Sequence, residues 1–97
     1  MAKGYWIGHV DISDPGAYAA YVAGNNEILP KYGGRFIVRG GEMQIVEGAM
    51  RGRHVVIEFP SYAQALAAYN SPEYRENMKI RLPAGEADLT IVEGYDG

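Results

Sequence analysis

The chain has 97 residues, 47% of them hydrophobic, with 9 basic and 12 acidic side chains and no cysteine. These totals predict one folded domain over residues 1–97 and exclude disulfide and thiolate chemistry, while the net charge of −3 argues against a nucleic-acid partner. No apolar run is long enough to cross a membrane and no signal-peptide core is present, so the sequence predicts a soluble, cytoplasmic protein.

The first third of the chain predicts a strand followed by a helix. Residues Gly4–Ile12 are rich in aromatic and branched side chains, as strands are. Asp14 is a favourable N-cap residue and Pro15 suits the first helical position, where a missing N–H costs nothing. Apolar side chains then recur every three or four residues up to Tyr32, and the pair Gly33-Gly34 predicts the end of this helix.

Residues 35–47 are strand-like on both sides of the pair Gly40-Gly41, and two interpretations compete. The pair either forms a two-residue hairpin turn or bends one long strand that turns only at residues 48–52. In the second arrangement Arg35–Arg39 extends beyond the end of its partner strand, where a second subunit would pair with it.

The second half of the chain predicts a strand, two short helices and a final strand. Arg53–Phe59 has the composition of a strong strand, and Ser61 is placed to cap a helix that begins just after it. Ser71-Pro72 repeats this start for a second short helix. Residues 81–88 read as a loop, and residues 89–95 as the last strand.

The resulting order, β-α-β-β-α-β, predicts an α+β fold: a ferredoxin-like sandwich in which an antiparallel sheet carries its helices on one face. Such a sheet leaves its second face bare. Adjacent apolar residues such as Val55-Val56-Ile57 predict instead that both faces are covered. A second copy of the chain is the simplest cover, so a homodimer is expected.

Several strings along the chain resemble one family: "KGYW", "KYGGRFIVRGG", "HVVIEFPSY", "SPEY" and "EADLTIVEGYDG". This is the domain of unknown function 1330 family, within the dimeric α+β barrel superfamily, and "VVIEFPSY" and "SPEY" are the most specific parts. The resemblance implies a ferredoxin-like subunit and a homodimer whose sheets pack face to face. It also favours the bent strand at Gly40-Gly41 over the hairpin. It assigns no reaction, because the superfamily includes cofactor-free monooxygenases, isomerases and plain binding proteins.

Three ionisable residues in predicted strands are candidates for acid–base catalysis: His9, His54 and Glu58. His54 and Glu58 share a strand face but lie about 13 Å apart along it, so they cannot form a dyad by themselves. His9 is the expected partner, because the first and third strands are neighbours in this topology. A structural role for these residues is the competing interpretation, and no metal site is predicted.

Arg39, Trp6, Tyr18 and Asn25 are the candidate ligand-binding residues. Arg35 and Arg39 are expected to project from one face of their strand, where Arg39 would clamp a carboxylate, block the sheet edge or pair with a second subunit. Trp6, Tyr18 and Asn25 are expected to line a cleft between helix and sheet that suits a flat organic ligand.

Two functions remain open at this stage. The first is a homodimeric protein that binds a small aromatic or carboxylate-bearing molecule in a pocket of each subunit, without a cofactor. The second is a cofactor-independent enzyme, resembling a monooxygenase or an isomerase.

Overall fold

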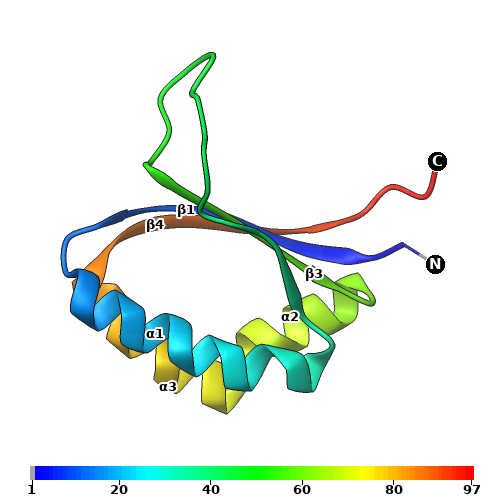
Figure 1. The fold of residues 1–97 in the computed structure, drawn as a ribbon. Helices are drawn as coiled ribbons and strands as arrows, with labels where there is room; N and C mark the ends of the chain where they lie inside the picture. The colour runs from blue at the N-terminus through cyan, green and yellow to red at the C-terminus, as the bar shows by residue number, and fades with distance from the viewer. Residues whose placement is uncertain (1) are drawn as a thin grey trace.

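The computed structural model describes residues 2–97, which form a four-stranded sheet with all helices on one side (Figure 1). In chain order the elements are β1 Gly4–Ile12, α1 Pro15–Ile28, η1 Leu29–Tyr32, β2 Arg35–Arg39, β3 Arg53–Phe59, α2 Tyr62–Asn70, α3 Pro72–Arg81, η2 Leu82–Ala84 and β4 Gly85–Glu93. The strand order is β2-β3-β1-β4 and every pair is antiparallel. The predicted ferredoxin-like α+β fold is confirmed.

The helices begin where the sequence predicts, because a polar side chain caps each one. The Asp14 carboxylate accepts a hydrogen bond from the Ala17 amide at 3.1 Å, and Pro15 follows in the first turn. The Ser61 and Ser71 hydroxyls accept from amides three residues onward in the same way. These caps fix α1, α2 and α3 in place beneath the sheet.

An aromatic cluster fills the space between the helices and the sheet. Trp6 is 1% exposed, and its ring centroid lies 5.4 Å from that of Phe59 and 4.9 Å from that of Tyr74. The Tyr74 ring meets Trp6 edge-on and the Phe59 ring is tilted against it, and such ring contacts add to the free energy gained by burying large apolar surfaces. The buried hydrophobic residues are Trp6, Val10, Tyr18, Tyr21, Leu29, Ile57, Phe59, Ala65, Ala68, Tyr74 and Ala84.

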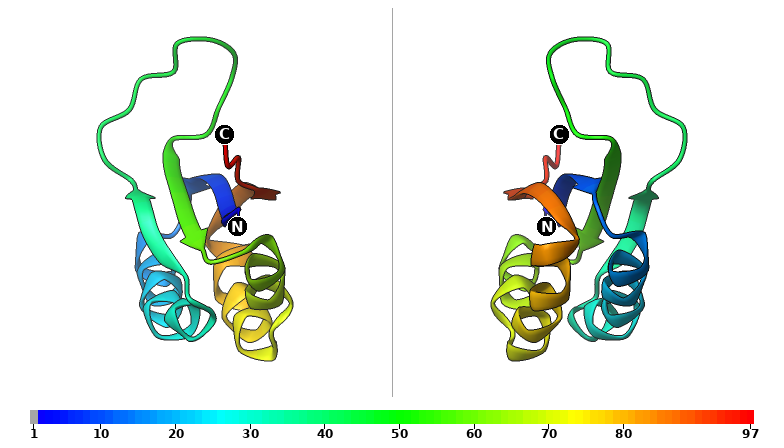
Figure 2. Two further views of the ribbon diagram at one scale, coloured as in Figure 1. Left: turned by 90° about the vertical axis from the view of Figure 1, so that its right-hand side faces the viewer. Right: turned by 90° about the vertical axis from the view of Figure 1, so that its left-hand side faces the viewer.

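Residues 40–52 form a long loop that stands up from the sheet on the side away from the helices (Figure 2). Neither predicted arrangement of Gly40-Gly41 forms. Arg35–Arg39 pairs directly with β3 instead of extending beyond it, and the strand expected after the glycines is absent. β1 occupies one edge of β3 and β2 occupies the other, so residues 42–47 have no free edge of β3 to join.

Strand β4 begins at Gly85, four residues earlier than the sequence suggests. Glycine and acidic residues at 85–88 are typical of turns, which is why this segment reads as a loop. Pairing with β1 overrides that local preference, because Gly85 lies opposite Ile12 and Asp88 opposite His9.

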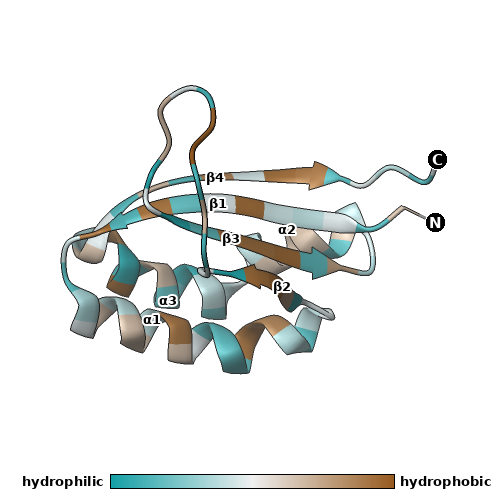
Figure 3. Cartoon of the chain, turned by 45° about the horizontal axis from the view of Figure 1, so that its top comes forward, coloured by the Kyte–Doolittle hydropathy of each residue, from teal (hydrophilic) through white to brown (hydrophobic). Residues whose placement is uncertain are grey.

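The face of the sheet away from the helices, here called the open face, is largely apolar at its centre. Ile7, Val38 and Val92 are 45%, 40% and 41% exposed there. Figure 3 looks onto this side and shows hydrophobic segments on all four strands. Single exposed apolar side chains are ordinary, but a contiguous group on a sheet face is typical of an interaction surface.

Candidate functional site

A small cavity lies between α1 and the sheet, and it brings together three of the four predicted ligand-binding residues. Trp6 comes from β1, whereas Tyr18 and Asn25 lie two turns apart on α1. The cavity has a volume of about 40 Å³. Its walls are mostly apolar and are formed by Trp6, Tyr18, Tyr21, Val22, Asn25, Phe36, Arg53, Val55, Ile57 and Leu89.

Trp6 and Asn25 are held in place in the cavity wall by hydrogen bonds within the protein. The Trp6 indole N–H donates to the Ala65 carbonyl at 2.9 Å. The Asn25 side-chain oxygen accepts from the Asn77 amide at 2.9 Å, and the same amide donates to the Tyr21 carbonyl at 3.0 Å. Because these polar groups are already engaged within the protein, they shape the cavity rather than reach for a ligand.

Arg39 is not part of the cavity wall. Its guanidinium carbon lies 4.8 Å from the centre of the Phe36 ring, and Phe36 lines the cavity, so Arg39 sits one layer outside. The arginine in the wall is Arg53. The sequence held a signal for it: Arg53, Val55, Ile57 and Phe59 alternate along β3, which places a cation on the face that is otherwise apolar.

The expectation that Arg35 and Arg39 share one face is wrong. β2 carries a bulge between Phe36 and Val38, and the extra residue reverses the alternation. Arg35 therefore lies opposite Glu58 on the open face, whereas Arg39 lies opposite Val55 on the helix face.

A second cavity adjoins the first. It also measures about 40 Å³ and shares Tyr18, Tyr21, Val55 and Leu89 with its neighbour. Arg81, the last residue of α3, contributes to its lining. The two tyrosine rings thus stand between two small spaces, each with one arginine in its wall.

His9 and His54 lie on the open face and stack against each other, as the expected neighbourhood of the first and third strands predicts. Their ring centroids are 5.5 Å apart and the planes differ by 7°. His9 Nδ1 accepts a hydrogen bond from the Arg51 amide at 2.8 Å, and its Nε2 is 3.8 Å from an Asp88 oxygen. His54 Nε2 is buried without a partner among the described residues.

Glu58 is on the same face but belongs to a different cluster. It accepts from Lys3 at 3.1 Å and from Arg35 at 3.2 Å, while Tyr5 donates at 3.4 Å. The hydrogen bond from Lys3 lowers the pKa of Glu58, and Arg35 adds to this effect while burial opposes it. The structure does not bring Glu58 together with the two histidines. His54 and Glu58 line neither cavity, whereas His9 is among the residues that line the second.

Arg51 organises the histidine end of the open face, and no pattern in the sequence identifies it. Its guanidinium pairs with Asp88 at 2.8 Å, Asp11 at 3.0 Å and Glu86 at 3.3 Å. The Gly52 amide also donates to Asp11, and this bond, followed by the one from Arg51, lowers the pKa of that carboxyl. These contacts fasten the end of the 40–52 loop to the sheet.

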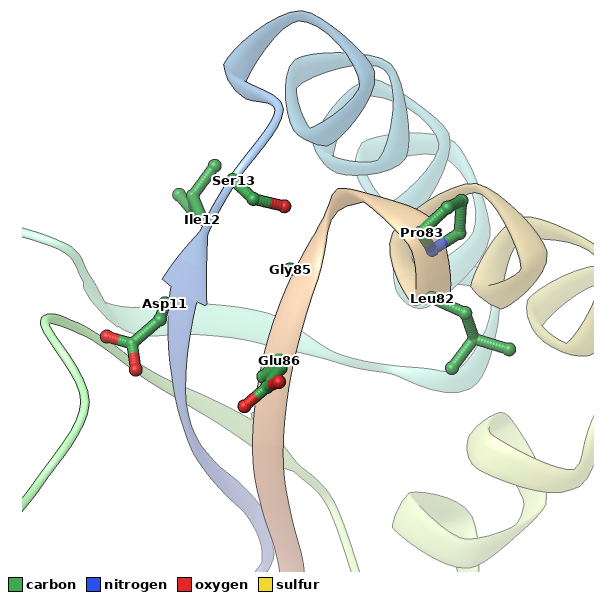
Figure 4. Close-up of a pocket in the computed structure, with 7 residues that line it drawn as sticks. All are labelled: Asp11, Ile12, Ser13, Leu82, Pro83, Gly85 and Glu86. Carbon is green, nitrogen blue, oxygen red and sulfur yellow. The ribbon is translucent and has the colours of Figure 1, made fainter.

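The depression beside this cluster is large but is no enclosed site. It measures about 400 Å³ and lies where β1 and η2 meet β4 (Figure 4). Its two carboxylates, Asp11 and Glu86, come from neighbouring strands, and both are already paired with Arg51. It is a surface hollow with satisfied polar groups, so the cavities beneath the sheet remain the better candidate.

No group of three His, Asp or Glu side chains among residues 2–97 is placed to hold a metal ion. No helix in the same range has the length and apolar character to span a bilayer.

Comparisons with solved structures support the fold. RPA0582 from Rhodopseudomonas palustris, a protein of unknown function, is 21% identical with a TM-score of 0.73, covering 99% of this chain and 85% of its own. SnoaB, a cofactor-independent oxygenase from Streptomyces nogalater, is 7% identical with a TM-score of 0.67, covering 100% and 97%. A dimeric ferredoxin-like protein of unknown function from Thermobifida fusca is 17% identical with a TM-score of 0.59, covering 95% and 89%.

Sequence comparison assigns the chain more directly. No curated protein matches it. The profile described as "Domain of unknown function (DUF1330)" matches residues 3–95, nearly the full length. The chain is therefore a member of the DUF1330 family.

Proposed function

We propose that this protein is a homodimer that binds a small aromatic or carboxylate-bearing molecule between α1 and the sheet of each subunit. The observation that carries the proposal is the pair of adjoining cavities lined by Trp6, Tyr18 and Tyr21, with Arg53 in the wall. Apolar and aromatic walls with a few placed polar groups are the usual composition of a small-molecule site.

The size of the cavities requires that the site opens. A space of about 40 Å³ holds a water molecule or two, whereas sites for organic ligands measure roughly 300–1,000 Å³. α1 packs closely on α3. Between α1 and the strands, the side chains of Tyr18 and Tyr21 line both cavities, so side chains rather than backbone divide the space. Rotation of Tyr18 would join the two cavities, and side-chain rotation is fast and inexpensive compared with backbone movement.

The open face supports the homodimer. Its exposed apolar side chains, including Ile7 and Val92, would be buried if two sheets packed together. The Thermobifida fusca neighbour is described as dimeric, and it shares the fold. Because the cavities lie on the opposite side of the sheet, each subunit would keep its own site.

An enzymatic role is the weaker alternative. SnoaB shares the fold and is an oxygenase, but at 7% identity the likeness concerns architecture alone. Of the candidate acid–base groups, His54 and Glu58 line neither cavity. His9 is among the residues that line the second cavity, but its ring stacks on His54 on the open face and its Nδ1 already accepts the Arg51 amide, so binding is the function we favour.

Trp6 provides the test, because it is the only tryptophan in the chain and forms part of the wall. A panel of aromatic and carboxylic acids should include molecules that change Trp6 emission saturably and raise the melting temperature. Val55→Phe fills the space that both cavities share and should abolish the response. Val56→Phe, on the next residue and the opposite face, should preserve binding per folded subunit.

The proposal fails if no molecule in the panel alters Trp6 emission. It also fails if Val55→Phe, shown by circular dichroism to be folded, binds as well as the wild type.

A further inference from the structure

We propose that Arg53 and Arg81 form a binding site for a carboxylate around the Tyr18 and Tyr21 rings, so that the molecule held beside α1 is an organic acid. This inference rests on the binding role proposed above and names the chemical class of the ligand.

The two guanidinium groups approach one pair of rings from two different elements. The Arg53 guanidinium carbon, at the start of β3, is 5.5 Å from the Tyr18 ring centre. The Arg81 guanidinium carbon, at the end of α3, is 5.7 Å from the Tyr21 ring centre. The two rings are themselves 5.5 Å apart. One arginine lines each cavity, so joining the cavities would expose both cations to one ligand.

Neither arginine is neutralised within the protein. The Nε atoms of Arg53 and Arg81 are both buried and have no hydrogen-bond partner, and no carboxylate among residues 2–97 forms an ion pair with either. Arg51, only two residues from Arg53, pairs with three carboxylates. Asp88 is the one acidic residue that lines either cavity, and its carboxylate is paired with Arg51 at 2.8 Å. Both side chains are half-buried, and an Nε–H group removed from water without an acceptor is costly, so an anion that accepts from it would offset that cost.

The tyrosine hydroxyls around the two arginines carry no negative charge. The Tyr21 and Tyr74 hydroxyls lie 2.6 Å apart in the core, and burial raises the pKa of Tyr74 so that its phenol stays neutral. Burial, aided by Tyr21, also raises the pKa of Tyr18, while Arg53 and Arg81 both oppose that rise. The positive fields of the two arginines therefore act on the same hydroxyl. Two guanidinium groups and a neutral phenol suit a carboxylate, which accepts several hydrogen bonds at once.

The experiment compares benzoate with benzamide, a neutral molecule of nearly the same shape, by calorimetry and by NMR of the arginine Nε–H signals. We expect benzoate to bind at least tenfold more tightly and to shift the Arg53 and Arg81 signals. Arg53→Met and Arg81→Met should each reduce benzoate affinity at least tenfold while leaving benzamide affinity unchanged. Arg53→Lys, which keeps the charge and is the gentler change for folding, should retain part of the benzoate affinity.

Arg75→Met is the matched control. The Arg75 guanidinium carbon also lies over a tyrosine ring, 4.8 Å from the centre of Tyr69, but this residue lines neither cavity. Its replacement should leave the affinity for both probes unchanged.

Each remaining outcome is decisive. Equal binding of benzoate and benzamide, with Trp6 emission changed by both, would overturn the carboxylate site while preserving the binding role. If chloride shifts the same arginine signals and benzoate does not bind, the site holds an inorganic anion, and the carboxylate proposal is overturned as well. If neither probe binds or changes Trp6 emission, both the carboxylate site and the proposed binding role are overturned.

Discussion

The imidazole rings of His9 and His54 stack in parallel across β1 and β3, 5.5 Å apart, on the face of the sheet that carries the 40–52 loop. His9 also accepts the Arg51 amide at 2.8 Å through Nδ1. The ring that stacks on His54 is thus the same ring that holds the end of the loop. Loss of Nδ1 at position 9 would therefore leave the Arg51 amide without its acceptor.

Replacing His9 with Phe should therefore loosen the loop end. Phe keeps an aromatic ring beside His54 but has no acceptor, so the Arg51 amide should lose protection from hydrogen exchange. The hydrogen bond contributes about 0.5–1.5 kcal/mol, which corresponds to roughly two- to tenfold faster exchange. NMR-detected exchange of the Arg51 amide measures this effect.

Equal protection of the Arg51 amide in His9→Phe and in the wild type would show that His9 does not hold the end of the loop.

Replacing Gly40 should destabilise the fold more than replacing Gly41. Both have positive φ, 71° and 92°, which β-branched residues adopt at a cost of about 1–3 kcal/mol. Gly40 also donates to the His54 carbonyl at 2.8 Å, and an added Cβ would approach Arg53 Nη1 at 3.0 Å. Urea midpoints for Gly40→Val and Gly41→Val test the order.

Gly16→Ala in α1 is the control for these glycines, since φ is ordinary there and the nearest atom to an added Cβ is 3.6 Å away. It should be neutral or stabilising by up to about 1 kcal/mol. If Gly40→Val and Gly41→Val both keep the wild-type urea midpoint, the loop accommodates the new side chains without loss of stability.

Tyr74→Phe should weaken the fold at neutral pH and make its stability less sensitive to alkali. The change leaves the Tyr21 hydroxyl without its partner at 2.6 Å, at a cost of about 1–3 kcal/mol. Burial raises the pKa of Tyr74 in the folded state above its unfolded value of 10.0. The unfolded chain therefore loses this proton first, and stability falls as pH rises above about 10.

Urea denaturation at pH 7, 9 and 10.5 measures both effects. Tyr62→Phe, at an exposed position on α2, should alter neither. A Tyr74→Phe variant as steep in its alkaline decline as the wild type would contradict the assignment of that decline to Tyr74.

Ile7→Lys should produce a monomer. Ile7 lies at the middle of β1 on the open face, where two sheets would meet, and a lysine there would bury a charge without a partner. Light scattering after size exclusion should give twice the chain mass for the wild type and the single-chain mass for the variant. A wild type that stays monomeric at micromolar concentration would contradict the homodimer.

The sequence predicts most of the fold because its local signals agree with the tertiary structure. β1 has the expected bounds, and the capping residues Asp14, Ser61 and Ser71 act as predicted. The start of β4 is missed because residues 85–88 have turn composition, and only pairing with β1 makes them a strand. Residues 42–47 look like a strand, but propensity does not reveal that both edges of β3 are taken.

The candidate site is predicted less well, for reasons of register and long-range packing. Trp6, Tyr18 and Asn25 line one cavity. Strand and helix periodicities place all three on the faces that turn toward each other, which is why the sequence could predict this part of the site. Arg35 and Arg39 are wrongly predicted to share one face, because a bulge cannot be read from residue types alone. Arg81 reaches the cavity only because α3 packs against α1. That contact joins residues far apart in the chain, so no local sequence pattern predicts it.

The bulge in β2 gives one short strand two separate uses for the experimenter. Arg35 is in contact with Glu58 on the open face, whereas Arg39 covers Phe36 beside the cavity. A probe attached at position 35 would sense the approach of a second subunit, and one at position 39 would sense events beside α1. Labelled singly, these two sites let assembly and ligand binding be followed independently within the same five residues.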